Sequence, residues 1–269
     1  MKLLDGKLIS RQIEEEIKNK IIGNNYHINM AVILDISDSA SLMYARIKSK
    51  VCDRLGIELR EIYIDKNTST EDLLGIIDVL NADDSINGII IQTPVSDKID
   101  LQTVFNRIRE DKDIDGLRDD SKFVPATASG ILKLLDLYNI NVNDKEIVII
   151  NRSNIIGKPL EKILKEKANV TVCHTQTEDL KAETLKADII ITATGKAKLI
   201  TEDMVKEGVV IIDAGTNYDS GLVCGDVDFE NVKDKAEYIT PVPGGVGPMT
   251  VISLINNLVK AYEMQNQNN

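Results

Sequence analysis

A tyrosine and a lysine four residues apart, Tyr44 and Lys48 in the stretch SLMYARIKSK, have the types and spacing for proton-transfer chemistry. On a helix these two positions project roughly 40° apart around the axis, so the hydroxyl and the amine converge on one face. On the wall of a cleft, such a pair could move protons to and from a substrate. The same spacing also fits an exposed amphipathic face, and the pair alone leaves both interpretations open.

Two further polar residues stand where ligands commonly bind. Gln92 ends the apolar run in IIIQTP, which predicts a buried strand. The carboxyl ends of parallel strands form the binding edge of an α/β sheet, so a polar side chain there indicates a site. Asp115 lies in DKDIDG, where an aspartate before glycine could equally be an ordinary turn residue.

A nucleotide site is indicated by EIVIINRSNIIGKP at residues 146–159, which predicts a buried strand, a tight turn and the start of a helix. This arrangement holds the pyrophosphate of a dinucleotide. Asn151 occupies the position expected for glycine, and only Gly157 is retained. The hypothesis follows that Asn151 adopts positive φ, which asparagine tolerates better than other non-glycine residues. A turn without a ligand is the alternative.

The end of the next predicted strand distinguishes NADP from NAD. NAD sites normally carry an acid there to hold the ribose hydroxyls, but this strand ends in Cys173, His174 and Thr175. An acid would repel a 2′-phosphate, whereas a hydroxyl and the nearby Arg152 guanidinium would hold it. The pattern favours NADP, although Arg152 could be a solvated surface residue and His174 a packed histidine at the strand end.

The elements that position these residues predict an α/β fold with two α/β lobes around a cleft. Alternating helices and strands before residue 118 predict a mostly parallel sheet. A connecting helix in TASGILKLLDLY is followed by a second alternating series, which predicts a Rossmann-like NADP-binding domain. We place a catalytic domain at 1–118 and the Rossmann-like domain at 119–249. The last helix could pack on either lobe, and we assign 250–269 to the first.

Composition and charge argue against several classes of protein. The 269 residues include 32 Lys and Arg against 43 Asp and Glu, a net charge of −11. This balance argues against nucleic acid and against a polybasic membrane surface. The apolar runs are too short to span a bilayer, and Asp5 interrupts any signal peptide. Three scattered cysteines and two histidines argue against a metal cage and fit a reducing cytosol, so we expect a cytoplasmic protein.

Together the motifs resemble the bifunctional methylenetetrahydrofolate dehydrogenase/cyclohydrolase family from Leu4 to about Tyr262. The most specific are ASLMYARIKSKVCDRLGI, GIIIQTPV, DKDIDG, RSNIIGKP and ITPVPGGVGPMTV, which also match in order and spacing. The resemblance implies a homodimeric enzyme of one-carbon metabolism and purine biosynthesis that acts on tetrahydrofolate derivatives. It would oxidise 5,10-methylenetetrahydrofolate with NADP and hydrolyse the methenyl product to 10-formyltetrahydrofolate.

The resemblance also implies which residues bind and react. Lys48 matches the catalytic lysine and Gln92 its partner. Tyr44 matches a catalytic-site tyrosine that stacks on the aminobenzoyl ring of the substrate. Asp115 matches the acid that holds the pterin, whose adjacent N–H donors suit a carboxylate.

The loop before the last helix would also contact folate, since its glycines let the backbone approach a ligand closely. The implied residues of this loop are Pro243, Gly244 and Gly245. The implied cofactor-binding residues are Asn151, Arg152, Ser153, His174, Thr175 and Thr216.

The chain departs from the family pattern near the cofactor. Asn151 replaces a glycine, Thr216 replaces an isoleucine, and PATASG stands in a shortened loop for the usual PCTPRG. Three alternatives are a dehydrogenase without the hydrolase step, a silent folate- or nucleotide-binding module, and a shikimate-type dehydrogenase. Retention of Lys48 and Gln92 argues against the first, and their retention together with Tyr44 and Asp115 argues against the second. PVPGGVGPMT argues against the third.

Replacement of Arg152 by alanine should weaken NADP binding far more than NAD binding. A charge-assisted contact with the 2′-phosphate is worth ~1.5–3 kcal/mol, or roughly a ten- to hundredfold change in affinity. Titration of both dinucleotides into the wild-type and Arg152→Ala proteins measures the difference. Equal losses for the two dinucleotides would remove Arg152 from the 2′-phosphate site.

Overall fold

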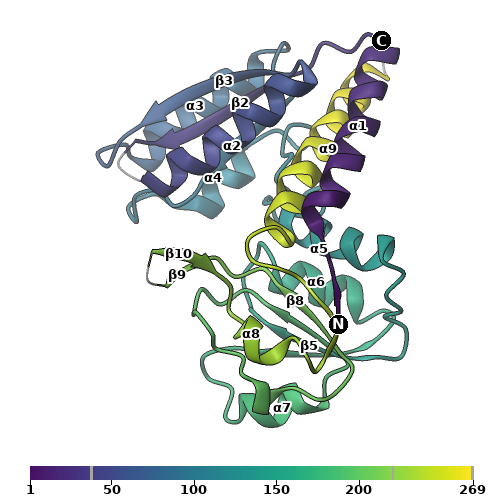
Figure 1. Cartoon of the computed structure of the whole chain (residues 1–269). Helices are drawn as coiled ribbons and strands as arrows, with labels where there is room; N and C mark the ends of the chain where they lie inside the picture. Colours follow the sequence, from purple (N-terminus) through teal and green to yellow (C-terminus); the bar gives the residue numbers. More distant parts are fainter. Residues whose placement is uncertain (37–38, 220, 268–269) are drawn as a thin grey trace. The chain divides into compact units, whose positions relative to one another are not determined.

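The computed structural model describes residues 1–36, 39–219 and 221–267, with the backbone alone at 39–44. The chain divides into two compact units, and each is made of two segments (Figure 1). Unit 1 comprises Met1–Gln12 and Thr127–Ser253, and unit 2 comprises Ile13–Ala126 and Leu254–Asn269. Within the described ranges, no helix combines the length and the apolar character that a membrane span needs.

Unit 2 is built on a three-stranded parallel sheet in the order β3-β2-β4. The strands are β2 (Asn29–Asp35), β3 (Glu58–Ile64) and β4 (Gly88–Gln92). The central strand β2 is buried along almost its whole length, as expected for a parallel strand covered on both faces. Its Leu34 pairs with Gln92, so the carboxyl ends of β2 and β4 lie side by side.

The connections of this sheet place helices on both of its faces. Helix α2 (Ser39–Leu55) joins β2 to β3, and α3 (Thr70–Ala82) joins β3 back past β2 to β4. Right-handed crossovers in opposite directions put the two helices on opposite faces. A capping box between Ser69 and Asp72 begins α3, and Gly56 follows α2 with φ +69°. Unit 2 also contains α4 (Leu101–Arg107).

Unit 1 contains a six-stranded parallel sheet in the order β1-β11-β8-β7-β5-β6. The strand order reverses between β5 and β7, so the predicted Rossmann-like arrangement is confirmed. The strands are β1 (Lys2–Leu3), β5 (Glu146–Ile150), β6 (Asn169–Cys173), β7 (Ile189–Thr192), β8 (Val209–Asp213) and β11 (Ala236–Ile239). A cluster of buried, mostly aliphatic side chains from these strands and from the segments between them forms part of its core.

The remaining elements of unit 1 are mostly short. Its helices within the sheet connections are α5 (Ala126–Leu137), α6 (Gly157–Leu164), α7 (Leu180–Lys186) and α8 (Phe229–Val232). A hairpin of β9 (Asn217–Asp219) and β10 (Leu222–Cys224) follows β8 (Figure 1). The stretch TEDMVKEG holds only the 3₁₀ helix η1 (Glu202–Met204).

The division of the structure falls inside two long helices, α1 (Gly6–Gly23) and α9 (Val246–Asn266). It differs from the predicted boundary between residues 118 and 119. The first residues belong to unit 1 because β1 pairs with β11 and Leu4 is fully buried. Residues 119–126 belong to unit 2, where Phe123 packs against Gly116. Which unit binds which ligand stays a prediction.

Candidate active site

A lysine and a glutamine meet at the carboxyl edge of the unit 2 sheet. The Lys48 amine on α2 donates a hydrogen bond of 2.7 Å to Oε1 of Gln92, the last residue of β4. Helix α2 follows the central strand β2, and β3 and β4 lie on opposite sides of β2, so the strand order reverses there. Ligands commonly bind at the carboxyl ends of the strands at such a reversal, and the bond between Lys48 and Gln92 lies at this place. Gln92 Nε2 donates to the Thr93 carbonyl at 3.0 Å, which fixes the amide with its oxygen towards the amine.

Asp115 is the third member of this site. Burial lowers the pKa of Lys48, and the Asp115 carboxylate opposes that shift. Burial likewise raises the pKa of Asp115, and the Lys48 cation opposes it. No hydrogen bond joins the Asp115 carboxylate to any residue in the described part of the chain. The structure therefore brings Lys48, Gln92 and Asp115 together in one unit, with an acid available to a ligand.

Tyr44 and Cys52 lie one helical turn before and one turn after Lys48 on α2. Tyr44 lies one turn earlier on this helix, and its side chain is outside the described residues. Its stacking role stays a prediction. One turn later, burial raises the pKa of the Cys52 thiol to about 12, so this cysteine is a neutral thiol at ordinary pH.

In unit 1, Asn151 begins the turn after β5 without adopting positive φ. It is not among the described non-glycine residues in the left-handed region, so the hypothesis of a left-handed Asn151 is wrong. Its side chain supplies the reason for the residue. Oδ1 accepts hydrogen bonds from Ser153 N at 2.8 Å, Ser153 Oγ at 2.7 Å and Gly157 N at 3.0 Å. Local conformational preference could not show which groups this side chain would reach.

The Asn151 side chain also joins two strands. Its Nδ2 donates to the Ala193 carbonyl at 2.6 Å, which ties the end of β5 to the end of β7 where the strand order reverses. Gly157 is required by close approach, because a Cβ at this position would lie 2.0 Å from the Asn151 carbonyl oxygen. The turn is thus held by a carboxamide and closed by one glycine.

The other predicted cofactor residues of this turn lie at the ends of β5 and β6, which are in register. Arg152 is exposed, and no ion pair or hydrogen bond links it to any residue that the structure describes. Thr175, two residues after the end of β6, is also exposed. His174 Nδ1 accepts from Gln176 N at 3.2 Å, so the imidazole stabilises the turn that follows β6. Binding of the cofactor by these residues stays a prediction.

Two buried aspartates that the sequence analysis did not single out organise the loops at the same edge. The Asp226 carboxylate accepts from Thr192 Oγ1 and Asn217 Nδ2, each at 2.9 Å, and from the N–H groups of residues 194 and 196. The Asp213 carboxylate accepts from Gly215 N at 2.9 Å and from the N–H groups of residues 226 and 227. Burial raises the pKa of Asp213 to about 6, against the pull of these donors.

These aspartates hold the segment that carries Thr216. Gly215 before it donates to the Asp213 carboxylate, and Asn217 after it donates to the Asp226 carboxylate. Thr216 itself is exposed. A Cβ at Gly215 would lie 2.2 Å from Asp226 Oδ1, so glycine is required for this contact. An acid at the end of a buried strand, in VVIIDAG, was the sequence signal that could have identified Asp213.

The backbone conformation and packing of the loop Pro243–Gly245 require its two glycines. Gly244 has φ +114°, and its carbonyl accepts from Lys7 N at 2.8 Å. A Cβ at Gly245 would lie 2.7 Å from the Pro241 carbonyl oxygen. Pro243 is exposed. The turn itself requires these residues, and their contact with folate stays a prediction.

Known proteins match the chain along nearly its whole length. Residues 4–115 match the tetrahydrofolate dehydrogenase/cyclohydrolase catalytic domain, and residues 125–266 match the NAD(P)-binding domain of the same family. The chain belongs to this family. It is 44% identical to the bifunctional protein FolD of Campylobacter jejuni, over 97% of this chain and 98% of that protein.

Solved structures agree with the family match. The crystal structure of the bifunctional FolD enzyme from Campylobacter jejuni aligns with a TM-score of 0.94 at 42% identity and covers 98% of this chain and 99% of that one. The Trypanosoma brucei enzyme, complexed with NADP cofactor and an inhibitor, aligns with a TM-score of 0.91 at 28% identity, over 97% of this chain and 96% of that one. The family therefore accounts for both units.

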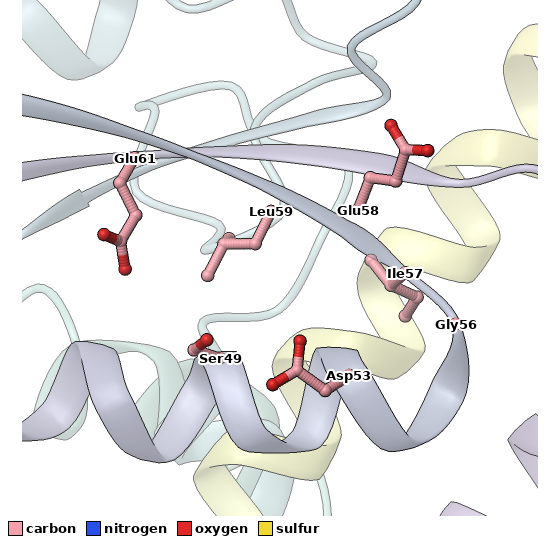
Figure 2. A pocket seen from close by; sticks show the side chains of 7 residues that line it. All are labelled: Ser49, Asp53, Gly56, Ile57, Glu58, Leu59 and Glu61. Atoms are coloured by element: carbon pink, nitrogen blue, oxygen red, sulfur yellow. The ribbon is translucent and has the colours of Figure 1, made fainter.

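A hollow elsewhere in unit 2 is distinct from this site. Figure 2 shows it between α2 and β3, with Ser49 and Asp53 projecting from the helix towards the strand. Asp53, Glu58 and Glu61 give its lining a negative charge, and no predicted site residue belongs to it. Among the described residues, no group of three or more Cys, His, Asp or Glu side chains could hold a metal ion.

Replacement of Asn151 by glycine should weaken NADP binding and lower the melting temperature. The turn would lose its bonds to Ser153, Gly157 and Ala193, a loss of about 1–3 kcal/mol. Dinucleotide titration and thermal unfolding measure the two effects, with Asn143→Gly in the exposed loop before β5 as the control. Unchanged or improved NADP binding in Asn151→Gly would contradict the bracing role.

Proposed function

We propose that this protein is a bifunctional enzyme that oxidises 5,10-methylenetetrahydrofolate with NADP and hydrolyses the resulting 5,10-methenyltetrahydrofolate to 10-formyltetrahydrofolate. The observation that carries the proposal is the hydrogen bond between Lys48 and Gln92, next to the Asp115 carboxylate. The family match supports both activities, and the bifunctional relatives support their presence on one chain.

Hydrolysis requires a proton acceptor, which Lys48 can provide. As water adds to the methenyl carbon it loses one proton. When the bond between that carbon and N5 breaks, the new hydroxyl loses its proton to become the formyl carbonyl and N5 gains one, so the hydrolysis releases one proton to solvent. Burial favours the neutral amine of Lys48, and a cationic substrate beside it would favour that form further. Gln92 holds the amine in place through its carbonyl oxygen. The amine can therefore take the proton from water and return it to the ring nitrogen.

Asp115 suits the binding of the pterin. Its carboxylate is partly buried and has no hydrogen-bond partner among the described residues, while burial raises its pKa. Two parallel N–H donors on the pterin edge would satisfy both oxygens and favour the ionised form. Asp115 would then hold the substrate for both reactions, with Lys48 beside it. The proposed ring stacking by Tyr44 rests on the family resemblance.

The residues around the β5 turn fit NADP. The exposed Arg152 cation and the Thr175 hydroxyl are available for a 2′-phosphate, and no acid ends β6. The Asn151 carboxamide accepts from the N–H groups of Ser153 and Gly157 and so fixes the turn before α6, where the pyrophosphate would bind. When bound, the cofactor accepts the hydride that the methylene carbon loses. The exposed Thr216 would contact the same ligand.

We also propose that the enzyme is a cytoplasmic homodimer whose product supplies formyl groups for purine biosynthesis. These proposals rest on the family resemblance.

A dehydrogenase without the hydrolase step would have no need of a partly buried lysine held by an amide, and a silent binding module would have no need of the lysine at all. The shikimate-type alternative is not supported, because both family matches concern tetrahydrofolate enzymes.

Replacement of Lys48 by methionine should abolish methenyl hydrolysis and leave a measurable fraction of the dehydrogenase activity. Hydride transfer needs alignment of the reactants and no proton acceptor on this side chain, whereas hydrolysis needs the amine. Absorbance assays of both reactions on one purified variant provide the test, with the exposed Lys50→Met on the same helix as control. Retained hydrolysis would refute the assignment, and equal loss of both steps would make Lys48 a positional residue.

A further inference from the structure

We propose that Asn257, on α9, is a positioning residue that holds Asp115 in the orientation in which its carboxylate binds the pterin. The inference rests on the proposed function of Asp115. Asn257 lies 143 residues from Ile114 in the sequence and takes no part in the motifs that indicate the activity. Both residues belong to unit 2.

Two hydrogen bonds connect Asn257 to the Asp115 loop. The buried Asn257 Nδ2 donates to the Ile114 carbonyl at 2.9 Å and to the Val124 carbonyl at 3.2 Å. An amide nitrogen has two hydrogens, so both are used. The Ile114 carbonyl belongs to the peptide group that joins Ile114 to Asp115. Because that group is planar, the bond also fixes the nitrogen and Cα of Asp115.

The backbone on the other side of Asp115 is fixed as well. Gly116 has φ +74°, and a Cβ there would lie 2.7 Å from the Phe123 carbonyl oxygen and 2.8 Å from Pro125 N. Gly116 therefore packs directly on the segment 123–125. Asn257 binds the carbonyl in the middle of that segment. One side chain thus joins the residue before Asp115 to the surface on which the residue after it packs.

The other charged residues of DKDIDG are used to build the loop. The Lys112 amine is buried and donates to the carbonyls of residues 80, 81 and 83 at the end of α3, at 2.8–3.0 Å. The Asp113 carboxylate accepts from the N–H groups of residues 117 and 118, each at 3.1 Å. Asp115 differs from both, because no described residue hydrogen-bonds its carboxylate. Lys112 and Asp113 thus hold the loop in place, and the Asp115 carboxylate remains available to a ligand.

Substitution of a residue that only stabilises the fold would change the affinity for both tetrahydrofolate and NADP, or for neither. A residue that acts through Asp115 should affect folate alone, and its effect should vanish once Asp115 is removed. The test therefore uses Asn257→Ala, Asp115→Ala and the double variant in the full-length protein. Asn256→Ala is the matched control, since Asn256 is the adjacent, half-buried asparagine of the same helix. Titrations with tetrahydrofolate and with NADP give the affinities.

Asn257→Ala should weaken tetrahydrofolate binding by about tenfold or more and leave NADP binding unchanged. In the Asp115→Ala background, the Asn257 substitution should cause no further loss of tetrahydrofolate affinity. Asn256→Ala should bind like the wild type. Additive losses in the double variant, wild-type tetrahydrofolate affinity in Asn257→Ala, or equal losses for NADP would each overturn the inference.

The outcomes separate this inference from the proposed function. Unchanged tetrahydrofolate affinity in Asp115→Ala would refute the pterin site itself. Weakened binding in Asp115→Ala together with normal binding in Asn257→Ala would refute the positioning role and leave the pterin site standing. If Asn257→Ala does not fold, Asn257→Ser keeps one donor and should give a smaller, folate-specific loss. A loss in Asn257→Ser that persists without Asp115 would overturn the inference in the same way.

Discussion

A lysine amine held partly out of water against a glutamine carbonyl is the interaction on which the proposed chemistry depends. Removal of water disfavours the ammonium, and burial is the largest cause of the lowered pKa of Lys48. The Gln92 carbonyl provides an acceptor for the amine in either protonation state. Asp115 limits the shift by favouring the cation. Burial and the Asp115 carboxylate thus act on the pKa of Lys48 in opposite directions, while Gln92 fixes the position of the amine.

Each unit uses a side-chain amide at the place where its strand order reverses. In unit 2, Gln92 at the end of β4 accepts a hydrogen bond from Lys48 on α2, the helix that follows β2. In unit 1, Asn151 joins the ends of β5 and β7 and caps the start of α6. A carboxamide has both donors and acceptors, so it can join two backbone segments that a glycine would leave unconnected. Buried carboxylates complete the edge in unit 1, where Asp226 gathers several donors around Thr216.

Regular patterns explain why much of this could be predicted from the sequence. A strand end and helical spacing made Gln92 and Lys48 candidates, the family resemblance of DKDIDG added Asp115, and the alternation of elements predicted the Rossmann-like sheet. The pairing of β1 with β11 could not be predicted, because two residues carry no periodicity. The role of Asn151 depends on which backbone groups its side chain reaches. Asn257 bonds to carbonyls more than 130 residues away, a tertiary contact without a local signal.

The most direct test of the account is a measurement of the Lys48 amine pKa by NMR titration of the specifically labelled protein. We predict a value below that of an ordinary lysine, because burial is the largest cause acting on this amine. Substitution Asp115→Asn should lower the pKa further, since it removes the anion that favours the ammonium. An ordinary or raised pKa for Lys48, or a rise on substitution of Asp115, would contradict the account.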